Sequence, residues 1–525
     1  MCMKKILPRV LALALVFAQA LCPAALADES TTTFDTAYKD NSANTEIYLV
    51  TQAPGSDYPS FHARWEPSGG VYFGRTIRGG TLPDGSYGLV NRGEMEEESA
   101  ISYYYDLNDS YSLEYWSYLF GPALEEGKRA FLVYLNFPGE GAFCERVASG
   151  ALDGKLQETF AYLGTLTCPV FVRIGGEVNV WDDRPQPERY IAAYRHAAGI
   201  ARGAAPNAAL VFSPNYSSAY EVDMDSFYPG DDCVDWVGVS LYYNRYSNNG
   251  DRERDQFYGV GVYGDALLNV QQVVNLSKLH SKPVIVTEGG SSNKYGEEDA
   301  SAWAAERLAK AMSCLTMVYP QIKCIISSDY GLEWAHTDYT FYDNAAVTAA
   351  YRKAVSGNPT LLSACGGAAS YYTKASAFQG PWEGKVELAA YTYAPEKQVG
   401  SWFVDGVWKA SLPGYPYSYT LDTSTLSAGE HTLRVVFENG AEKSVKFQVG
   451  AGQAASAPGA ASAAVSAVPT NDKLYVDGVL QAATVYKIDG SNYFKLRDLG
   501  QALDFSVGYD PALGVSVSGE SGYNG

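Results

Sequence analysis

The chain has 525 residues, more than one ordinary core needs, so we expect several domains. Aromatic residues make up 13%, with 41 Tyr, which is typical both of β-rich cores and of sites that stack sugar rings. The net charge of −20 disfavours nucleic acid or an anionic membrane as a partner, since both bind basic patches, whereas a neutral glycan is compatible with it.

Residues 1–27 have the organisation of a secretory signal peptide. A basic start is followed by the apolar run Val10–Leu21 and by Ala25-Leu-Ala, a small-residue cleavage site. The apolar run is shorter than the roughly 20 residues that a membrane-spanning helix needs, and no other stretch predicts one. We therefore expect a protein that is secreted, extracellular or associated with the cell surface, in which residues 28–68 form an N-terminal extension.

Residues 69–357 alternate short apolar runs with helical patterns, as in a (β/α)8 TIM barrel. Fully apolar runs indicate strands that are buried on both faces. The predicted strands are Val71–Arg75, Ile101–Tyr105, Ala130–Leu135, Val170–Ile174, Ala209–Ser213, Trp236–Leu241, Val284–Thr287 and Cys324–Ser328. The predicted helices are Gly154–Leu163, Glu188–Arg202, Asp265–His280 and Asp299–Val318.

The pattern changes after the predicted barrel. Residues 367–450 show strand alternation and turn residues, which predicts an all-β sandwich, either Ig-like or carbohydrate-binding. Residues 451–469 consist almost entirely of Ala, Gly, Ser, Pro and Val, which predicts a flexible linker. Residues 470–520 predict a small α+β module.

Two glutamates follow predicted barrel strands, Glu177 after the fourth and Glu288 after the seventh. In a barrel, residues at the carboxyl ends of the strands share the active face. Retaining glycosidases place two carboxylates about 5 to 5.5 Å apart there, one as acid/base and one as nucleophile. For one glutamate alone, the alternative is a loop carboxylate that caps a helix or pairs with an arginine such as Arg173.

Several sequence strings appear in the order and at the distances of a known family. They are Ala148-Ser-Gly-Ala-Leu-Asp-Gly, Arg173-Ile-Gly-Gly-Glu177-Val-Asn179, Tyr190-Ile-Ala-Ala-Tyr-Arg-His, Ser213-Pro-Asn215, Tyr228-Pro-Gly-Asp-Asp-Cys-Val-Asp-Trp-Val-Gly and Lys282-Pro-Val-Ile-Val-Thr-Glu288. Together they resemble glycoside hydrolase family 26, the β-mannanase family of the large barrel clan. Its strand-four motif is Arg-Pro-x-His-Glu-x-Asn, so Arg173, Glu177 and Asn179 are in register with it.

The resemblance implies that Glu177 is the acid/base and Glu288 the nucleophile. It also implies that Arg173 and Asn179 contribute to substrate binding. The chain departs from the motif at Gly176, which replaces a His that in the family helps to hold the acid and the sugar. Because of this departure, the substrate can also be a β-glycan other than mannan.

Further residues near the ends of predicted strands are candidates for substrate binding. A hydroxyl of Tyr242 or Tyr243 can orient Glu288, or these side chains are only part of the core. Trp181 and Trp334 can stack on sugar rings or pack in their loops, and Asn215 can bind a sugar hydroxyl or form a turn. Hydrolysis by two carboxylates needs no metal and no organic cofactor, so we expect neither.

The C-terminal residues resemble a second known module. The strings Leu474-Tyr-Val-Asp-Gly, Tyr493-Phe-Lys-Leu-Arg-Asp-Leu-Gly and Val507-Gly-Tyr-Asp are similar to the N-terminal-like domain of copper amine oxidases. In secreted bacterial proteins such modules act as stalks or wall-associated units. The resemblance implies attachment or spacing at residues 470–520 and no redox chemistry.

The sequence therefore predicts a secreted retaining glycoside hydrolase that cleaves a β-linked polysaccharide or oligosaccharide, most similar to an endo-β-1,4-mannanase. One alternative is a hydrolase of another β-glycan, mixed-linkage glucan or xylan. Another is a surface protein that binds glycan without cleaving it, and a third is a structural surface protein. Both glutamates are retained, which argues against a protein that only binds glycan. The clustering of motif residues at strand ends argues against a structural surface protein.

Overall fold

The computed structural model describes residues 45–450 and parts of 468–523. Within the first range it leaves out residues 91–95, 138–139, 181–185, 217–222, 246–264, 333–336, 341–343 and 395–396. The predicted signal peptide 1–27, most of the predicted linker, Trp181 and Trp334 lie outside the described residues. The chain divides into two compact units, Met1–Ala451 and Gly452–Gly525, and each is described by itself.

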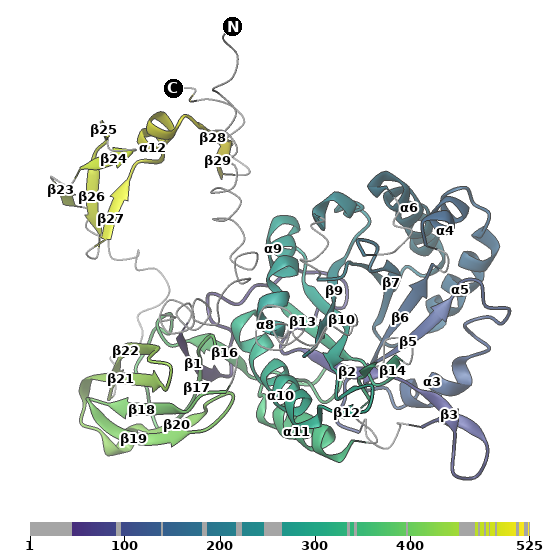
Figure 1. Ribbon diagram of the computed structural model, residues 1–525, viewed down its shortest axis with the longest axis horizontal. Coiled ribbons are helices and arrows are strands. Elements are labelled where there is room, and N and C mark those ends of the chain that lie inside the picture. Colours follow the sequence, from purple (N-terminus) through teal and green to yellow (C-terminus); the bar gives the residue numbers. More distant parts are fainter. Residues whose placement is uncertain are drawn as a thin grey trace, which may run out of the picture. The chain divides into compact units, whose positions relative to one another are not determined.

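The first unit contains a closed barrel of eight parallel strands, which confirms the predicted TIM barrel (Figure 1). In barrel order the strands are β2 Tyr72–Thr76, β5 Ala100–Asp106, β6 Ala130–Asn136, β7 Val170–Gly176, β8 Ala208–Ser213, β9 Trp236–Tyr243, β10 Val284–Ser291 and β13 Ile322–Ser327. The helices are α3 Ser117–Leu124, α4 Glu140–Ala148, α5 Asp153–Thr165, α6 Pro187–Ala204, α8 Ala266–Asn269, α9 Gln271–His280, α10 Ser301–Val318 and α11 Ala345–Gly357.

Strand alternation divides the barrel residues between two cores. On β6, Leu132 and Tyr134 point into the barrel, where Trp236 of β9 also lies. Phe131 and Val133, the alternate residues, pack outward against the helices. Apolar residues on both faces explain why these strands read as continuous apolar runs in the sequence.

A buried charge cluster lies where the barrel closes. The last strand, β13, pairs in parallel with the first, β2, and Ser327 is opposite Arg75. The Arg75 guanidinium bonds Glu98 at 2.8 Å and Asp329 at 3.4 Å, and all three side chains are buried. These contacts hold the segment that follows β13, which reaches the site described below.

Short β-elements follow three strands at the carboxyl end of the barrel. A hairpin of β3 Gly79–Thr81 and β4 Tyr87–Leu89 follows β2. A four-stranded sheet lies after β10 and β13, in the order β12 Glu298–Asp299, β11 Lys294–Tyr295, β15 Thr337–Asp338 and β14 Gly331–Leu332.

Two further four-stranded sheets share a core in the same unit. One has the order β16 Tyr371–Lys374, β1 Glu46–Thr51, β17 Lys385–Tyr391 and β20 Tyr419–Asp422. The other has the order β19 Val407–Leu412, β18 Gly400–Val404, β21 Gly429–Phe437 and β22 Glu442–Val449. Strand β1, from the predicted N-terminal extension, is a central strand between β16 and β17.

The first of these sheets also packs on the barrel. Ile47 and Leu49 of β1 point into the core between the sheets. Tyr48, between them, and Tyr391 of β17 belong to the core around the barrel helices. The two β-sheets and the barrel therefore form one packed unit.

The second unit consists of small β-elements and one helix. A three-stranded sheet has the order β23 Val468–Thr470, β26 Val485–Ile488 and β27 Ser491–Phe494. Two hairpins are β24 Leu474–Val476 with β25 Val479–Gln481 and β28 Ser506–Asp510 with β29 Gly514–Ser518, and the helix is α12 Leu496–Leu503. Within the described ranges of both units, none of the helices combines the length and apolar character needed to cross a bilayer.

Candidate active site

Glu177 and Glu288 both lie at irregular points near the carboxyl ends of barrel strands. The pairing of β7 with β8 shifts register between Arg173 and Gly176, directly before Glu177. The pairing of β10 with β9 shifts register between Val286 and Glu288. Such irregularities turn a side chain away from the regular strand direction and are frequent next to active sites.

The backbone of Glu177 has a left-handed conformation, with φ of 56°. This conformation is uncommon for a residue with a side chain and is found preferentially at functional sites. The Glu177 amide donates to the Ser213 carbonyl at 3.0 Å, which anchors the turn to the end of β8. The Glu177 side chain is half-buried, so that it is held in place and still reaches solvent.

Two asparagines position the Glu177 carboxyl group. The Asn215 amide donates to Glu177 Oε1 at 2.8 Å. Asn179 binds the backbone of Asn215 with both ends of its own amide, at 2.9 Å to the carbonyl and 2.8 Å to the N–H. Asn215 therefore contacts the candidate acid directly, and the buried Asn179 acts through Asn215.

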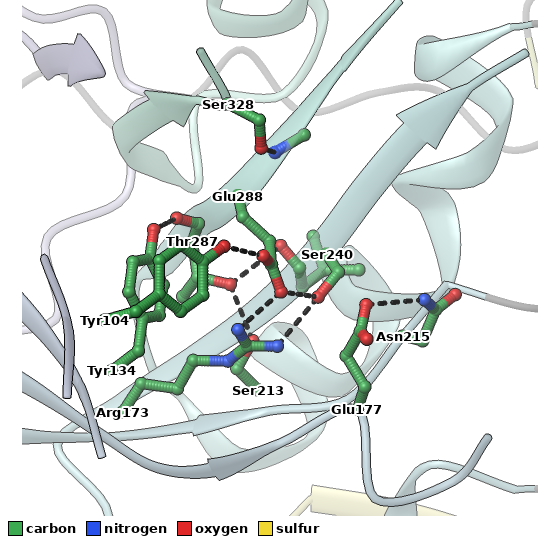
Figure 2. Close-up of polar contacts among 12 residues, drawn as sticks. Tyr104, Tyr134, Arg173, Glu177, Ser213, Asn215, Ser240, Thr287, Glu288 and Ser328 are labelled. Atoms are coloured by element: carbon green, nitrogen blue, oxygen red, sulfur yellow. Dashed lines mark hydrogen bonds and ion pairs between the residues drawn. The ribbon is translucent and has the colours of Figure 1, made fainter. Parts of the chain in front are cut away.

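The Glu288 carboxylate is buried, and both of its oxygens accept hydrogen bonds (Figure 2). Oε1 accepts from the Arg173 guanidinium and from the Ser240 hydroxyl, the latter at 2.8 Å. Arg173 also donates to Ser240 at 2.8 Å, which closes a triangle of polar contacts. The sequence raised the alternative that Arg173 pairs with Glu177, but the ion pair in the structure is between Arg173 and Glu288.

The second oxygen of Glu288 is bound by tyrosines from three strands or strand ends. Tyr104 of β5 donates to Oε2, as does Tyr242 of β9 at 3.2 Å and Tyr330 after β13 at 3.5 Å. Burial, followed by the charge of Glu288, raises the pKa of each of these tyrosines. Their hydroxyls therefore stay protonated and remain donors at any working pH.

These residues form one layer across the barrel. Tyr104 is opposite Tyr134, and Tyr134 is opposite Arg173, in the pairing of β5, β6 and β7. The Tyr104 and Tyr134 rings stack with centroids 4.1 Å apart, and Tyr134 also bonds the Thr287 carbonyl. On the other side of the barrel, Glu288 is opposite Ser240.

The two carboxyl groups have pKa values shifted in opposite directions. Burial, and then the charge of Glu288, raise the pKa of Glu177, although Arg173, Ser240 and Asn215 partly oppose the rise. Burial would also raise the pKa of Glu288, but the Arg173 charge and hydrogen bonds from Tyr104, Arg173 and Ser240 lower it below its ordinary value. The two shifts favour a protonated Glu177 beside an ionised Glu288.

Of the other residues predicted for the site, one lies in it, one lies in the core, and two are not described by the structure. Tyr242 lies in the site, but Tyr243, the next residue, points outward into the core around the barrel helices. Trp181 and Trp334 lie outside the described residues. In the part of the chain that the structure describes, no three His, Cys, Asp or Glu side chains converge as they would around a metal ion.

Four residues in the site were not predicted from the sequence: Tyr104, Tyr134, Ser240 and Tyr330. Ser240 carried a usable signal, because a polar residue in the apolar run of β9 must find a partner inside the barrel. Tyr104 did not, because it is the middle one of three consecutive tyrosines.

No family model matches the chain. A curated relative, β-1,3-xylanase TXYA from Vibrio sp., is 26% identical over 169 residues, which is 32% of this chain and 32% of that protein. The match thus spans about a third of the length of this curated relative.

Among solved structures, an endo-β-1,4-mannanase double mutant from Cellulomonas fimi aligns with a TM-score of 0.41 and 14% identity, over 76% of this chain and 100% of that chain. The family 26 β-mannanase BoMan26A from Bacteroides ovatus aligns with a TM-score of 0.40 and 17% identity, over 57% of this chain and 91% of that chain. Because one fold hosts many activities, function has to be argued from the site.

Proposed function

We propose that the barrel is a retaining glycoside hydrolase that acts on a β-linked polysaccharide, with Glu177 as acid/base and Glu288 as nucleophile. One observation supports this most strongly: at the same end of the barrel, Asn215 binds the Glu177 carboxyl group while Arg173 and Ser240 bind the Glu288 carboxylate, and the pKa values of the two glutamates shift in opposite directions. Pairs of titratable groups whose environments separate their pKa values in this way divide the roles of acid and base between them.

The chemistry follows in two steps. Glu288 attacks the anomeric carbon, the glycosidic C–O bond breaks, and the leaving oxygen takes the proton of Glu177. Glu177, now ionised, then removes a proton from water, and that water displaces Glu288 from the anomeric carbon. Arg173 and the tyrosine hydroxyls stabilise the Glu288 carboxylate before it attacks and when it is released.

We propose mannan as the first substrate to test, with endo-β-1,4-mannanase-like action, because the strand motifs resemble glycoside hydrolase family 26. Gly176 departs from that motif at the residue before the acid. The substrate panel therefore includes mixed-linkage glucan and β-1,4-xylan. It also includes β-1,3-xylan, because the curated relative is named a β-1,3-xylanase.

The test is release of reducing ends from the four polymers by the wild type, Glu177→Gln and Glu288→Gln. We expect Glu177→Gln to lose about 10²–10⁴-fold in kcat, the usual contribution of a positioned acid, and Glu288→Gln to lose at least as much. Glu158→Gln, an exposed glutamate on α5, is the matched control and should keep wild-type activity. If the wild type binds a polymer but releases reducing ends from none of the four, the result would instead support a glycan-binding protein.

We further propose that the protein works outside the cell, on the basis of the signal-peptide pattern in residues 1–27. The resemblance of residues 470–520 to stalk modules supports a role of this segment in cell-wall or surface association. Cell fractionation of the producing organism tests the location, and binding of the isolated segment to cell walls tests the attachment.

A further inference from the structure

Five aromatic side chains gather in the segments that follow β2 and β5 at the carboxyl end of the barrel, away from the two glutamates. They are Tyr87, Tyr111, Tyr115, Trp116 and Tyr118, called the aromatic platform below. Among the described residues, the four tyrosines are exposed to 58%, 51%, 51% and 46%, respectively, whereas most large apolar side chains are buried. Clustered exposure of this kind marks an interaction surface in a soluble protein.

The platform rings contact one another. Tyr111 and Tyr115 stack with centroids 4.3 Å apart, and Trp116 meets both edge-on, at 5.9 and 5.3 Å. Tyr118, in the first turn of α3, lies 6.0 Å from Tyr115 and 6.1 Å from Trp116. Strand β4, which carries Tyr87, contacts helix α3, which carries Tyr118, and Figure 1 shows β3, the hairpin partner of β4, beside α3.

Hydrogen bonds fix the loop that carries the rings. Asp109 accepts from the Tyr111 amide at 2.9 Å and from the Trp116 indole at 3.0 Å. The Tyr111 carbonyl accepts from Tyr105 and from Lys155, both at 2.9 Å. The platform is therefore held in one arrangement before any partner arrives, which reduces the entropy cost of binding.

The platform lies on the same rim as the candidate active site. The loop with Tyr111 and Tyr115 leaves the end of β5, the strand from which Tyr104 donates to Glu288. At most about 25 Å of extended backbone separates Tyr104 from Tyr111. A chain of several sugar units can span such a separation, so one polymer can reach both the glutamates and the platform.

We propose that the aromatic platform binds the glycan chain beyond the units held at Glu177 and Glu288, as a distal subsite for neutral polymeric substrate. This inference rests on the proposed function. A sugar ring has an apolar C–H face and hydroxyl edges, and tyrosine offers a ring face together with a hydroxyl. Asp109, which accepts from Trp116 of the platform, and the net charge of −20 disfavour polyanions as the partner.

The test compares binding of soluble β-mannan, β-1,3-xylan, β-1,4-xylan and mixed-linkage glucan by full-length proteins that carry Glu288→Gln, so that the polymers remain intact. A triple variant, Tyr87→Ala/Tyr115→Ala/Tyr118→Ala, should bind the preferred polymer about tenfold more weakly, a fraction of the stacking energy of three aromatic contacts. The matching triple Phe variant should retain most of the affinity, because it keeps the rings. Trp408→Ala, an equally exposed aromatic on β19, is the control and should bind as the parent does.

Equal polymer affinity in the Ala triple variant and its parent would overturn the inference, as would equal losses in the Ala and Phe variants. Dissociation of a dimer by the Ala substitutions, with polymer binding intact, would identify the platform as a protein interface and also overturn it. With Glu288 restored, the ratio of kcat/KM for polymer over a tetrasaccharide should fall in the Ala triple variant. Loss of binding in that variant, together with no hydrolysis by the wild type, would uphold the platform and refute the hydrolase.

Discussion

Gly176 is required for the contact between Arg173 and Glu288. A Cβ atom at position 176 would lie 2.2 Å from Cζ and 2.4 Å from Nε of Arg173. The guanidinium therefore occupies the space that a side chain would need, and the His of the family 26 motif does not fit unless Arg173 moves. The buried ion pair between Arg173 and Glu288 therefore depends on the glycine that replaces the His of the motif.

Gly176→Ala should displace Arg173 and weaken its hydrogen bonds to Glu288 and Ser240. We expect kcat/KM to fall about 10- to 100-fold, which corresponds to a hydrogen bond to a charged group of ~1.5–3 kcal/mol. Arg173 lowers the pKa of both glutamates, so its displacement raises both values. Both limbs of the pH–rate profile should consequently move to higher pH.

Gly199→Ala is the control for this change. Gly199 is an exposed residue of α6, and a Cβ atom there meets nothing within 4 Å. This substitution should leave the pH–rate profile unchanged and stabilise the protein by up to about 1 kcal/mol, because Ala favours the helix. A Gly176→Ala profile that matches the wild type would contradict the positioning role of Gly176.

Among the barrel elements, the strands were the most predictable. Each of the eight predicted strands coincides with a barrel strand to within two residues at its start, because strands buried on both faces appear as apolar runs. Helix α3 was not predicted, since it is short and contains Pro122. Strand β1 was also missed, because its partners β16 and β17 lie more than 300 residues along the chain and leave no local signal.

Residues of the site could be predicted from the sequence where they lie at the end of a predicted strand. Of the residues predicted beside the two glutamates, Asn215 contacts Glu177, Asn179 holds Asn215, and Arg173 and Tyr242 contact Glu288. The sequence did not show which neighbours share the barrel interior, since that depends on the register between strands. Tyr104 and Ser240 reach Glu288 only because their strands pair in this register.

The two four-stranded sheets that share a core, those of β1 and β18, differ in the burial of two tryptophans on neighbouring strands. Trp402 of β18 is fully buried, and its indole donates to the Tyr417 carbonyl at 3.1 Å. Trp408 of the neighbouring β19 is 59% exposed. Trp402→Ala should reduce the free energy of unfolding by about 3–5 kcal/mol, whereas Trp408→Ala should stay within about 0.5 kcal/mol.

Urea denaturation followed by tryptophan fluorescence and far-ultraviolet circular dichroism measures both changes. Similar losses in the two variants would mean that the outer face of β19 is covered in the native protein. No loss in Trp402→Ala would contradict the shared core of the two sheets.

In the molecule as a whole, the barrel, the aromatic platform and the two β-sheets belong to one compact unit, and residues 452–525 form another. The chemistry assigned to Glu177 and Glu288 uses only residues of the first unit. The mechanism requires an ionised Glu288 and a protonated Glu177, so activity should be highest between the lowered pKa of Glu288 and the raised pKa of Glu177.

The configuration of the sugar released first is the most direct test of a nucleophilic Glu288. Proton NMR during hydrolysis of the preferred polymer by full-length protein resolves the two anomers before they interconvert. Two displacements at the same carbon predict that the β anomer appears first and that Glu288→Gln abolishes its release. Initial release of the α anomer, or undiminished release by Glu288→Gln, would contradict a covalent intermediate on Glu288.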